Sequence, residues 1–365
     1  MRYSVRGQLA IPFLFVARLG AALAPDHLTR GNLLFEHGSY PEAIAEYDGA
    51  LPLAGSATNR AEVLYRLALT HGKLAEFPAA ERYYKEALDI LRAHGDSPRL
   101  ALTLGGLGEV YRAEHRLDDA LAAERHALGI LHRLGMSETQ HAAVMLTITG
   151  GILYDQHRTK AAQENLREAL SILDKTVGPD HPDFAVTLHN LGAVEASRKN
   201  YDEAEGLFTR ALRIREERFG PAHPLIAGTL LSLSTVYLQQ KRYAEADRTC
   251  RRSLDMMRRF LPANHPDLIE AHINLAVIEH RSGDAGAAID VLEEAVHSLN
   301  ARPATVTGEY IQLLNLYSRY LGDAGEKEKS RRFRLEARRL AEQFGGISPA
   351  SSTVSAAELE ASRLH

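Results

Sequence analysis

The sequence predicts an all-α fold, a right-handed superhelical solenoid of about eight helix-turn-helix repeats. Three observations support this prediction. Small residues recur with a period of 42 residues, the apolar residues between them follow a helical i, i+3, i+4 spacing, and turn signals stand at matching places in successive copies. No window shows the alternation that is typical of a strand.

The small residues form a ladder along the chain. The first small position of each repeat is occupied, in six successive copies, by Gly108, Gly150, Gly192, Ser234, Ala276 and Ser318. Small residues also stand 12 and 19 positions after each member, and the triplets Gly31/Ala43/Ala50 and Ala68/Ala80/Ala87 repeat the same offsets earlier in the chain. Two helices can approach to about 8–10 Å only where side chains are small, so the ladder predicts paired helices.

Larger apolar residues fill the space between the small ones. The fifth copy uses Leu188, Leu191, Phe208 and Leu212 for this purpose. The single cysteine, Cys250, occupies the position that Phe208 and Tyr84 occupy in other copies, which predicts a buried core thiol rather than a reactive one.

Turn signals mark the helix ends. Within a copy they are Gly38–Pro41, Lys199–Asp202 and Ser282–Asp284. Between copies the chain carries Gly178 and Gly220, which suit a helix C-terminus, and then Pro182, Pro224 and Pro266, which suit the first turn of the next helix.

The register predicts a solenoid over residues 25–344 and a disordered tail over 345–365. The repeats are expected at about 24–60, 61–100, 101–142, 143–184, 185–226, 227–268, 269–310 and 311–344.

Two interpretations of residues 1–24 stay open. Arg2 and Arg6, an apolar run over 9–17 and the small residues of Ala22-Leu23-Ala24 favour a secretory signal peptide. Pro12 and Arg18 interrupt that run and favour an apolar helix that covers the first repeat. The protein is accordingly expected to be either cytoplasmic or, if these residues are cleaved, exported to a periplasm or secreted.

Composition argues against several functions. The 43 basic and 47 acidic side chains give a net charge of −4, which does not favour nucleic acid, and no segment reaches the roughly 18 apolar residues of a transmembrane helix. No cofactor or metal site is predicted, because the 17 histidines include no His-Glu-x-x-His pattern and His181, His223 and His265 recur one repeat apart in separate loops. The glycine-rich stretch 104–108 lacks the strand of a phosphate-binding loop, and the register assigns it to helix packing. No catalytic residues are predicted.

The ladder resembles the tetratricopeptide repeat family, over about residues 24–342. The 42-residue period, the His-Pro loops and the first-helix segments 188–191 and 272–275 resemble the kinesin light chain subtype, most closely in copies five to seven. The longer period implies helices about one turn longer than those of a repeat of about 34 residues.

In such a solenoid the first helix of each pair lines the concave side. The register predicts that a common set of polar and aromatic side chains points into this groove. The set is Glu109, Arg112, Tyr154, His189, Asn190, Ser232, Thr235, Gln239, Asn274, His280 and Arg281. The family resemblance implies that asparagines at the place of Asn190 and Asn274 bind peptide backbone, and Ser232 replaces the amide between them.

The predicted function is a non-enzymatic protein-protein interaction scaffold that binds an extended peptide or a partner protein in the concave groove. The alternative is a docking or regulatory subunit of a larger enzyme or signalling complex, which would use convex or terminal surfaces. An enzyme would need a pocket of converging titratable groups that the sequence does not reveal. The oligomeric state is not readable from the sequence.

Overall fold

The computed structural model describes residues 25–300 and 308–343, and these residues form α-helices, one short 3-10 turn and their connections, with no strand among them. They divide into two compact units. The N-terminal unit contains residues 25–194 and 206–223, and the C-terminal unit contains residues 195–205, 224–300 and 308–343. Residues 1–24, for which the sequence leaves a signal peptide and an apolar helix as alternatives, and the predicted disordered tail lie outside the described residues.

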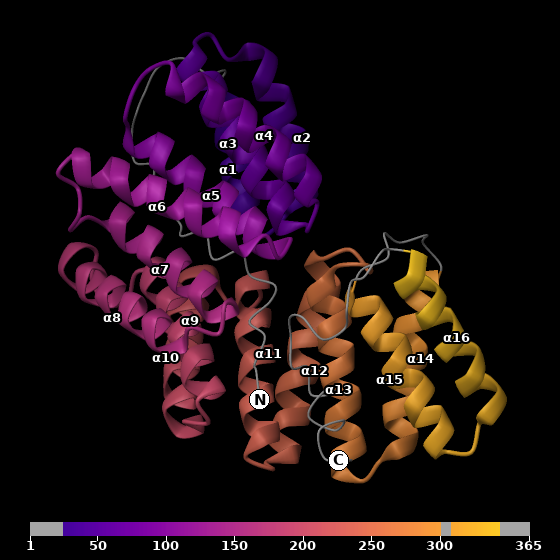
Figure 1. The fold of residues 1–365 in the computed structure, drawn as a ribbon. Helices are drawn as coiled ribbons and strands as arrows, with labels where there is room; N and C mark the ends of the chain where they lie inside the picture. The colour runs from indigo at the N-terminus through magenta and orange to yellow at the C-terminus, as the bar shows by residue number, and fades with distance from the viewer. Residues whose placement is uncertain (1–24, 301–307, 344–365) are drawn as a thin grey trace. The chain divides into compact units, whose positions relative to one another are not determined.

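The N-terminal unit is built from helical hairpins (Figure 1). Its complete helices are α1 (Pro25–Glu36), α2 (Tyr40–Ala50), α3 (Ala57–Lys73), α4 (Phe77–Arg92), α5 (Pro98–Ala113), α6 (Leu117–Arg133), α7 (Gln140–Asp155) and α8 (Thr159–Thr176). A 3-10 turn over Leu51–Leu53 follows α2. Each odd-numbered helix packs on the even-numbered helix that follows it, and α5 also contacts α3 and α7 in a layer of first helices.

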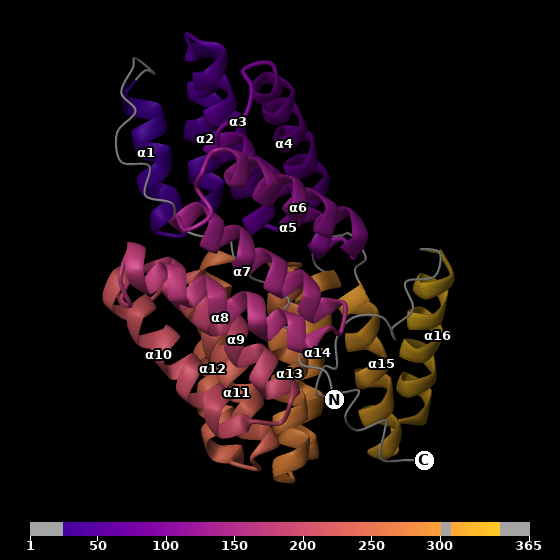
Figure 2. The same cartoon turned by 60° about the vertical axis from the view of Figure 1, so that its left-hand side comes forward.

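Two helices contribute residues to both units, α9 (Pro182–Ser197) and α10 (Tyr201–Phe219). The C-terminal unit also repeats the hairpin (Figure 2). Its complete helices are α11 (Pro224–Gln239), α12 (Tyr243–Phe260), α13 (Pro266–Ser282), α14 (Ala285–Asn300), α15 (Gly308–Asp323) and α16 (Lys327–Gln343). Here α11, α13 and α15 form the layer of first helices. The predicted all-α fold of helix-turn-helix repeats is confirmed.

Helix length explains the 42-residue period. Helices α5 and α6 contain 16 and 17 residues and α9 and α10 contain 16 and 19, whereas α1 and α2 contain 12 and 11. The longer hairpins account for the longer repeat, as the sequence predicts.

The small-residue ladder marks the closest approach of the two helices in a hairpin. A Cβ placed on Gly108 would lie 3.4 Å from the carbonyl oxygen of Ala120, and one on Gly150 would lie 3.4 Å from that of Ala162. A Cβ on Gly192 would lie 3.0 Å from the Phe208 ring. A larger side chain at these places would force the helices apart or displace the facing ring.

A single left-handed residue closes the turn inside each hairpin. In the second to sixth hairpins this residue is not glycine, yet its φ angle lies between +57° and +65°. The eight residues are Gly38, Ala75, His115, His157, Lys199, Lys241, Gly283 and Gly325. The same backbone conformation therefore recurs at one point of the repeat, whatever the side chain.

The His-Pro loops between repeats are helix caps. Pro266 is the first residue of α13, and the Nδ1 atom of His265 accepts a hydrogen bond from the backbone N–H of Asp267 at 3.2 Å. His181 accepts from the backbone N–H of Asp183 in the same way at 3.2 Å. A helix start leaves backbone N–H groups without partners, and an accepting ring nitrogen satisfies one of them. His181 and His265 therefore have a structural role in their own loops.

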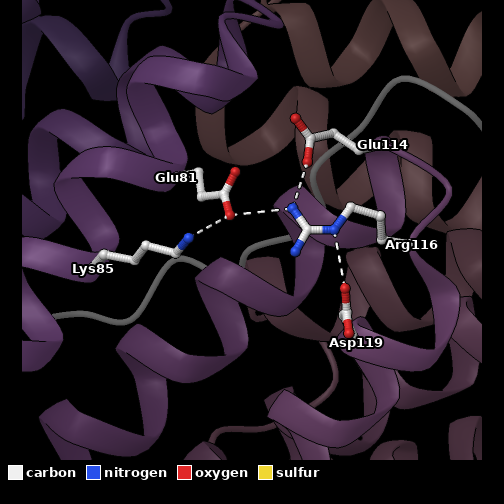
Figure 3. Close-up of polar contacts among 5 residues, drawn as sticks. All are labelled: Glu81, Lys85, Glu114, Arg116 and Asp119. Carbon is white, nitrogen blue, oxygen red and sulfur yellow. Dashed lines mark hydrogen bonds and ion pairs between the residues drawn. The ribbon is translucent and has the colours of Figure 1, made fainter.

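Arginines on the outer side connect successive hairpins. Arg116 lies at the α5–α6 turn, and its guanidinium contacts Glu81 of α4 at 3.1 Å, Glu114 at 3.2 Å and Asp119 at 3.0 Å (Figure 3). Glu81 also pairs with Lys85 at 2.8 Å. This network ties the second hairpin to the third.

The C-terminal unit has an equivalent arginine network between two successive hairpins. Arg242, at the α11–α12 turn, contacts Glu205 of α10 at 2.7 Å and also pairs with Glu245. The arginine and the two carboxylates occupy the same repeat positions as Arg116, Glu81 and Asp119. The sequence period therefore extends to polar contacts between repeats.

Candidate functional site

Five of the predicted groove residues lie in the N-terminal unit, on its first helices. Glu109 and Arg112 come from α5, Tyr154 from α7, and His189 and Asn190 from α9, and all five are buried. Their position in the helix layer agrees with the register. Their burial means that they line the inside of packed helices and are not ordinary exposed polar positions.

Arg112 is the centre of a buried charge network. Its Nε donates a hydrogen bond to Oδ2 of Asp155 at 2.6 Å, and its Nη1 lies 3.5 Å from Glu109 Oε1. Burial alone would lower the pKa of Arg112, but the charges of Asp155 and Glu109 raise it above its ordinary value. Gly151 leaves room for this guanidinium, because a Cβ there would lie 2.8 Å from Arg112 Nη1. The ion pair therefore joins α5 to α7.

The charged form of Glu109 is less well stabilised by its surroundings than that of Arg112. Burial raises the pKa of its carboxyl group, and the charges of Arg112 and Lys73 oppose that effect without cancelling it. Its Oε1 atom has no hydrogen-bond partner among the described residues.

His189 and Asn190 bring polar atoms to α9 that have no hydrogen-bond partner in the described part of the chain. Both ring nitrogens of His189 lack one, and so does the Nδ2 atom of Asn190. The His189 ring packs edge-on against Phe208 with its centroid at 5.2 Å. Burial, with the charges of Arg215 and Arg112, lowers the pKa of His189 well below its usual range. The imidazole is therefore neutral and offers one donor and one acceptor.

The other six predicted groove residues lie in the C-terminal unit. Ser232, Thr235 and Gln239 come from α11, and Asn274, His280 and Arg281 come from α13 or its last turn. Asn274 is buried, and the other five are half-buried. This stretch of the first-helix layer is thus more open than its counterpart in the N-terminal unit.

Within the C-terminal unit the structure brings two of these residues together. Asn274 Nδ2 donates to Thr235 Oγ1 at 3.5 Å, which is a long hydrogen bond, and Thr235 donates to the Leu231 carbonyl at 3.2 Å. Gln239 Nε2 has no hydrogen-bond partner among the described residues. The amides of Asn274 and Gln239 thus keep capacity for a further partner.

His280 is placed by stacking. Its ring lies flat against Tyr320 of α15, with centroids 4.2 Å apart and planes 8° apart. The face of the His280 ring is therefore used for packing α13 on α15.

The other candidates from the sequence have structural roles. The glycine-rich stretch 104–108 lies inside α5, where Gly106 faces the Tyr84 ring and Gly108 faces Glu124. Cys250 is buried, its Sγ donates to the Ala271 carbonyl at 3.6 Å, and burial raises its thiol pKa to about 12. The predicted core thiol is confirmed. Among residues 25–300 and 308–343, no group of three or more His, Cys, Asp or Glu side chains could hold a metal ion.

Several buried charged residues were not singled out from the sequence, and Glu124 and Arg215 are two of them. Glu124 of α6 is fully buried, and neither of its carboxyl oxygens has a hydrogen-bond partner among the described residues. Arg215 of α10 is also buried, and burial lowers its pKa to about 9. The register contained a signal for Glu124, because Tyr47, Tyr84 and Phe208 occupy the equivalent position in other repeats.

No helix in the described ranges combines the length and apolarity needed to cross a membrane. The layered hairpins, with polar side chains on the first helices, define the class as a helical-repeat protein.

The sequence model of the tetratricopeptide repeat family matches residues 23–93, 60–132, 141–217, 183–258 and 225–300. The chain therefore belongs to the tetratricopeptide repeat family. None of the curated proteins compared with this chain matches its sequence.

Several solved structures are similar to this chain. A Rap protein complexed with competence and sporulation factor is 17% identical, with 87% of this chain and 97% of that chain covered and a TM-score of 0.58. The apo form of RapI is 14% identical, with 89% and 100% covered and a TM-score of 0.50. A kinesin light chain from Podosopora anserina with nearly identical tetratricopeptide-like repeats is 18% identical, with 54% and 94% covered and a TM-score of 0.46. The two Rap structures support the fold.

Proposed function

We propose that this protein is a non-enzymatic scaffold that binds an extended peptide or a partner protein along its layers of first helices. The observation that carries the proposal is the set of amide groups on these helices with unused hydrogen-bonding capacity. Asn190 Nδ2 and Gln239 Nε2 have no partner among the described residues, and Asn274 makes only one long bond. Stacked helical repeats form an extended surface, which suits a protein or peptide as the occupant.

Amides suit this task for a chemical reason. An extended peptide offers a backbone N–H and a C=O at each residue, and a carboxamide can bond both at once. Such contacts give affinity that does not depend strongly on the ligand's side chains. Thr235, which bonds Asn274, and Ser232 on the same helix are half-buried and add short hydroxyl groups that accept and donate.

The similar Rap protein was solved as a complex with competence and sporulation factor. At 17% identity that likeness concerns the fold alone, so we extend to this chain only the expectation of a protein or peptide partner.

The test uses one asparagine substitution in each unit. Asn190→Ala and Asn274→Ala are compared with Asn165→Ala on the second helix α8, where the amide donates to the Ala161 carbonyl of its own helix. Partners are captured from the native host with each variant and measured by quantitative mass spectrometry. We expect one set of partners to be lost with Asn190→Ala or Asn274→Ala and kept with Asn165→Ala.

Hydrogen exchange with a captured partner then locates the contact. The proposal expects protection on α7, α9, α11 or α13 and little change on α8 or α12. Protection confined to second helices, with partners unchanged in both groove variants, would instead favour docking through outer or terminal surfaces.

A further inference from the structure

Helix α16 carries an unusual exposed leucine. Leu335 is 57% exposed, and arginines occupy all four helical neighbour positions, i−4, i−3, i+3 and i+4. These are Arg331, Arg332, Arg338 and Arg339, and all four are exposed. We call these five residues the arginine-framed patch.

Most of the patch charge has no carboxylate partner among residues 25–300 and 308–343. Within the described residues only Arg338 has a carboxylate partner, Glu342 at 2.8 Å, and both side chains of that pair are well exposed. Arg332 lies over the Phe333 ring at 5.1 Å, which leaves its charge intact. An exposed i, i+4 pair contributes little and opens readily.

Two exposed arginines of helix α12, in the same unit, make ion pairs with neighbouring helices. Arg251 pairs with Asp247 and Glu279, and Arg258 pairs with Glu294 on α14. These arginines bridge neighbouring helices, whereas those around Leu335 bridge no two helices in the part of the chain that the structure describes. A structural role in the solenoid therefore accounts for Arg251 and Arg258 and not for the patch.

The apolar face of α16 is already used inside the unit. Phe333, Ala337 and Leu340 are buried on the opposite side of the helix, against α15. Leu335 is left as a single apolar side chain amid positive charge. Arginine is enriched at the energetic centres of protein interfaces, and Leu335 adds apolar surface among the arginines that a partner side chain can cover.

We infer that the arginine-framed patch docks an acidic segment of a partner protein, one that places an apolar side chain on Leu335 between carboxylate groups. The planar guanidinium accepts carboxylates in bidentate geometry, and complementary charge sets partner choice and association rate. This surface lies on a second helix and is separate from the peptide-binding layer proposed above.

Two other polyanions fit less well. A nucleic-acid duplex presents charged phosphates on its outer surface and its apolar base faces are stacked inside, so it leaves Leu335 uncovered, and the net charge of −4 opposes its approach. A membrane surface requires a broad apolar face for insertion, and the apolar face of α16 points inward.

The experiment measures fluorescence anisotropy of a labelled amphipathic peptide of about 20 residues that carries glutamates on both sides of a leucine stripe. The same peptide with glutamine at every glutamate, a DNA duplex, and phosphatidylcholine vesicles containing phosphatidylserine serve as the other probes. The proteins are the full chain, Arg331→Glu/Arg339→Glu, Leu335→Ala, and the control Arg248→Glu/Arg259→Glu, which reverses two exposed charges on α12.

We expect the full chain to bind the glutamate peptide about tenfold or more tightly than the glutamine peptide, and the α16 reversal to remove that preference. Leu335→Ala should weaken binding without any change in charge, and the α12 reversal should not. Circular dichroism melts establish that all variants are folded.

Each of the following results would overturn the inference. One is equal loss of binding with the α12 and α16 reversals, which would show a diffuse charge effect. Another is unchanged binding in Leu335→Ala. The third is stronger binding to the duplex or the vesicles than to the peptide, or no binding of the peptide at all. Asn274→Ala, which tests the peptide-binding layer, should bind the acidic peptide normally, so failure of one proposal is distinguishable from failure of the other.

Discussion

The carboxyl group of Glu124 packs against Gly108, in the place where other repeats hold an aromatic ring. A Cβ on Gly108 would lie 2.7 Å from Glu124 Oε1, just as one on Gly31 would lie 2.6 Å from the Tyr47 ring. Glu124 is fully buried, and neither of its oxygens has a hydrogen-bond partner among the described residues. The third repeat therefore carries a polar group at an apolar packing site.

Replacement of Glu124 by Leu should stabilise the protein. Burial, together with the charge of Glu109, raises the pKa of Glu124 well above its ordinary value, and Leu166 fills the equivalent site of the next repeat. Removal of a buried polar group without a partner should raise the free energy of unfolding by about 1–3 kcal/mol. Urea denaturation followed by circular dichroism measures this change.

The same carboxyl predicts a pH dependence. The folded state holds the Glu124 proton more tightly than the unfolded state, so stability is fully present below the ordinary glutamate pKa and is lost as pH rises toward the folded value. Glu124→Gln should abolish this loss, and Glu86→Gln, at an exposed position of α4, should leave it. The unfolding free energy is measured by urea denaturation between about pH 5 and 8. If it changed with pH equally in wild type and Glu124→Gln, Glu124 would not be the titrating group.

Disruption of the Arg112–Asp155 pair should cost more than disruption of a surface pair. Asp155→Asn leaves the buried guanidinium with only Glu109, and we expect a loss of about 2–4 kcal/mol in unfolding free energy. Glu217→Gln breaks the exposed Arg213–Glu217 contact of 2.8 Å and should cost less than about 1 kcal/mol. Equal losses from the two substitutions would mean that burial of Arg112 does not matter.

Glycine at a left-handed turn should stabilise, and alanine there should destabilise. Ala75 has a φ of +57° and Gly325 a φ of +87°. Ala75→Gly should therefore gain up to about 1 kcal/mol and Gly325→Ala should lose about 1–2 kcal/mol.

Gly206→Ala is the control for Gly325→Ala, because the same substitution should here raise the free energy of unfolding. Gly206 lies in helix α10 with open space around its Cβ position, so alanine should gain about 1 kcal/mol of helix propensity. Melting midpoints of the three variants test the set. If Gly325→Ala and Gly206→Ala shifted the midpoint in the same direction, backbone conformation would not be the cause.

Acid should destabilise the N-terminal unit through His223. This ring is stacked on Phe219 at 4.4 Å, and burial lowers its pKa to about 3. The unfolded chain takes up a proton near about pH 6.5 and the folded chain does not, so stability falls as pH drops from about 6.5 toward 3. Each such histidine adds a slope of about 1.4 kcal/mol per pH unit.

The slope, rather than the absolute stability, tests this assignment, because His223→Gln also removes the ring contact. Between about pH 7 and 5, the slope of unfolding free energy against pH reports the protons taken up on unfolding. His223→Gln should take up about one proton fewer, so its slope should be smaller. The exposed His94→Gln should keep the wild-type slope. An unchanged slope in His223→Gln would show that another group governs acid sensitivity.

The sequence alone determined the fold class, because every repeat carries the same local packing requirements. Gly108, Gly150 and Gly192 are small where two backbones must approach, and Pro182, Pro224 and Pro266 start helices where an N–H would have no partner. These requirements recur every 42 residues, and a periodic local requirement is readable without coordinates.

The tertiary structure decided what the first helices present. The register assigned Arg112 and His189 to one face, but it could not show that both are buried, that Asp155 neutralises the former, or that Phe208 packs on the latter. Burial and pairing depend on the distance between residues of different repeats, which a period does not specify. For the same reason Glu124 was not singled out from the sequence, and only the packed helices show that its carboxyl group is fully buried against Gly108, with no hydrogen-bond partner among the described residues.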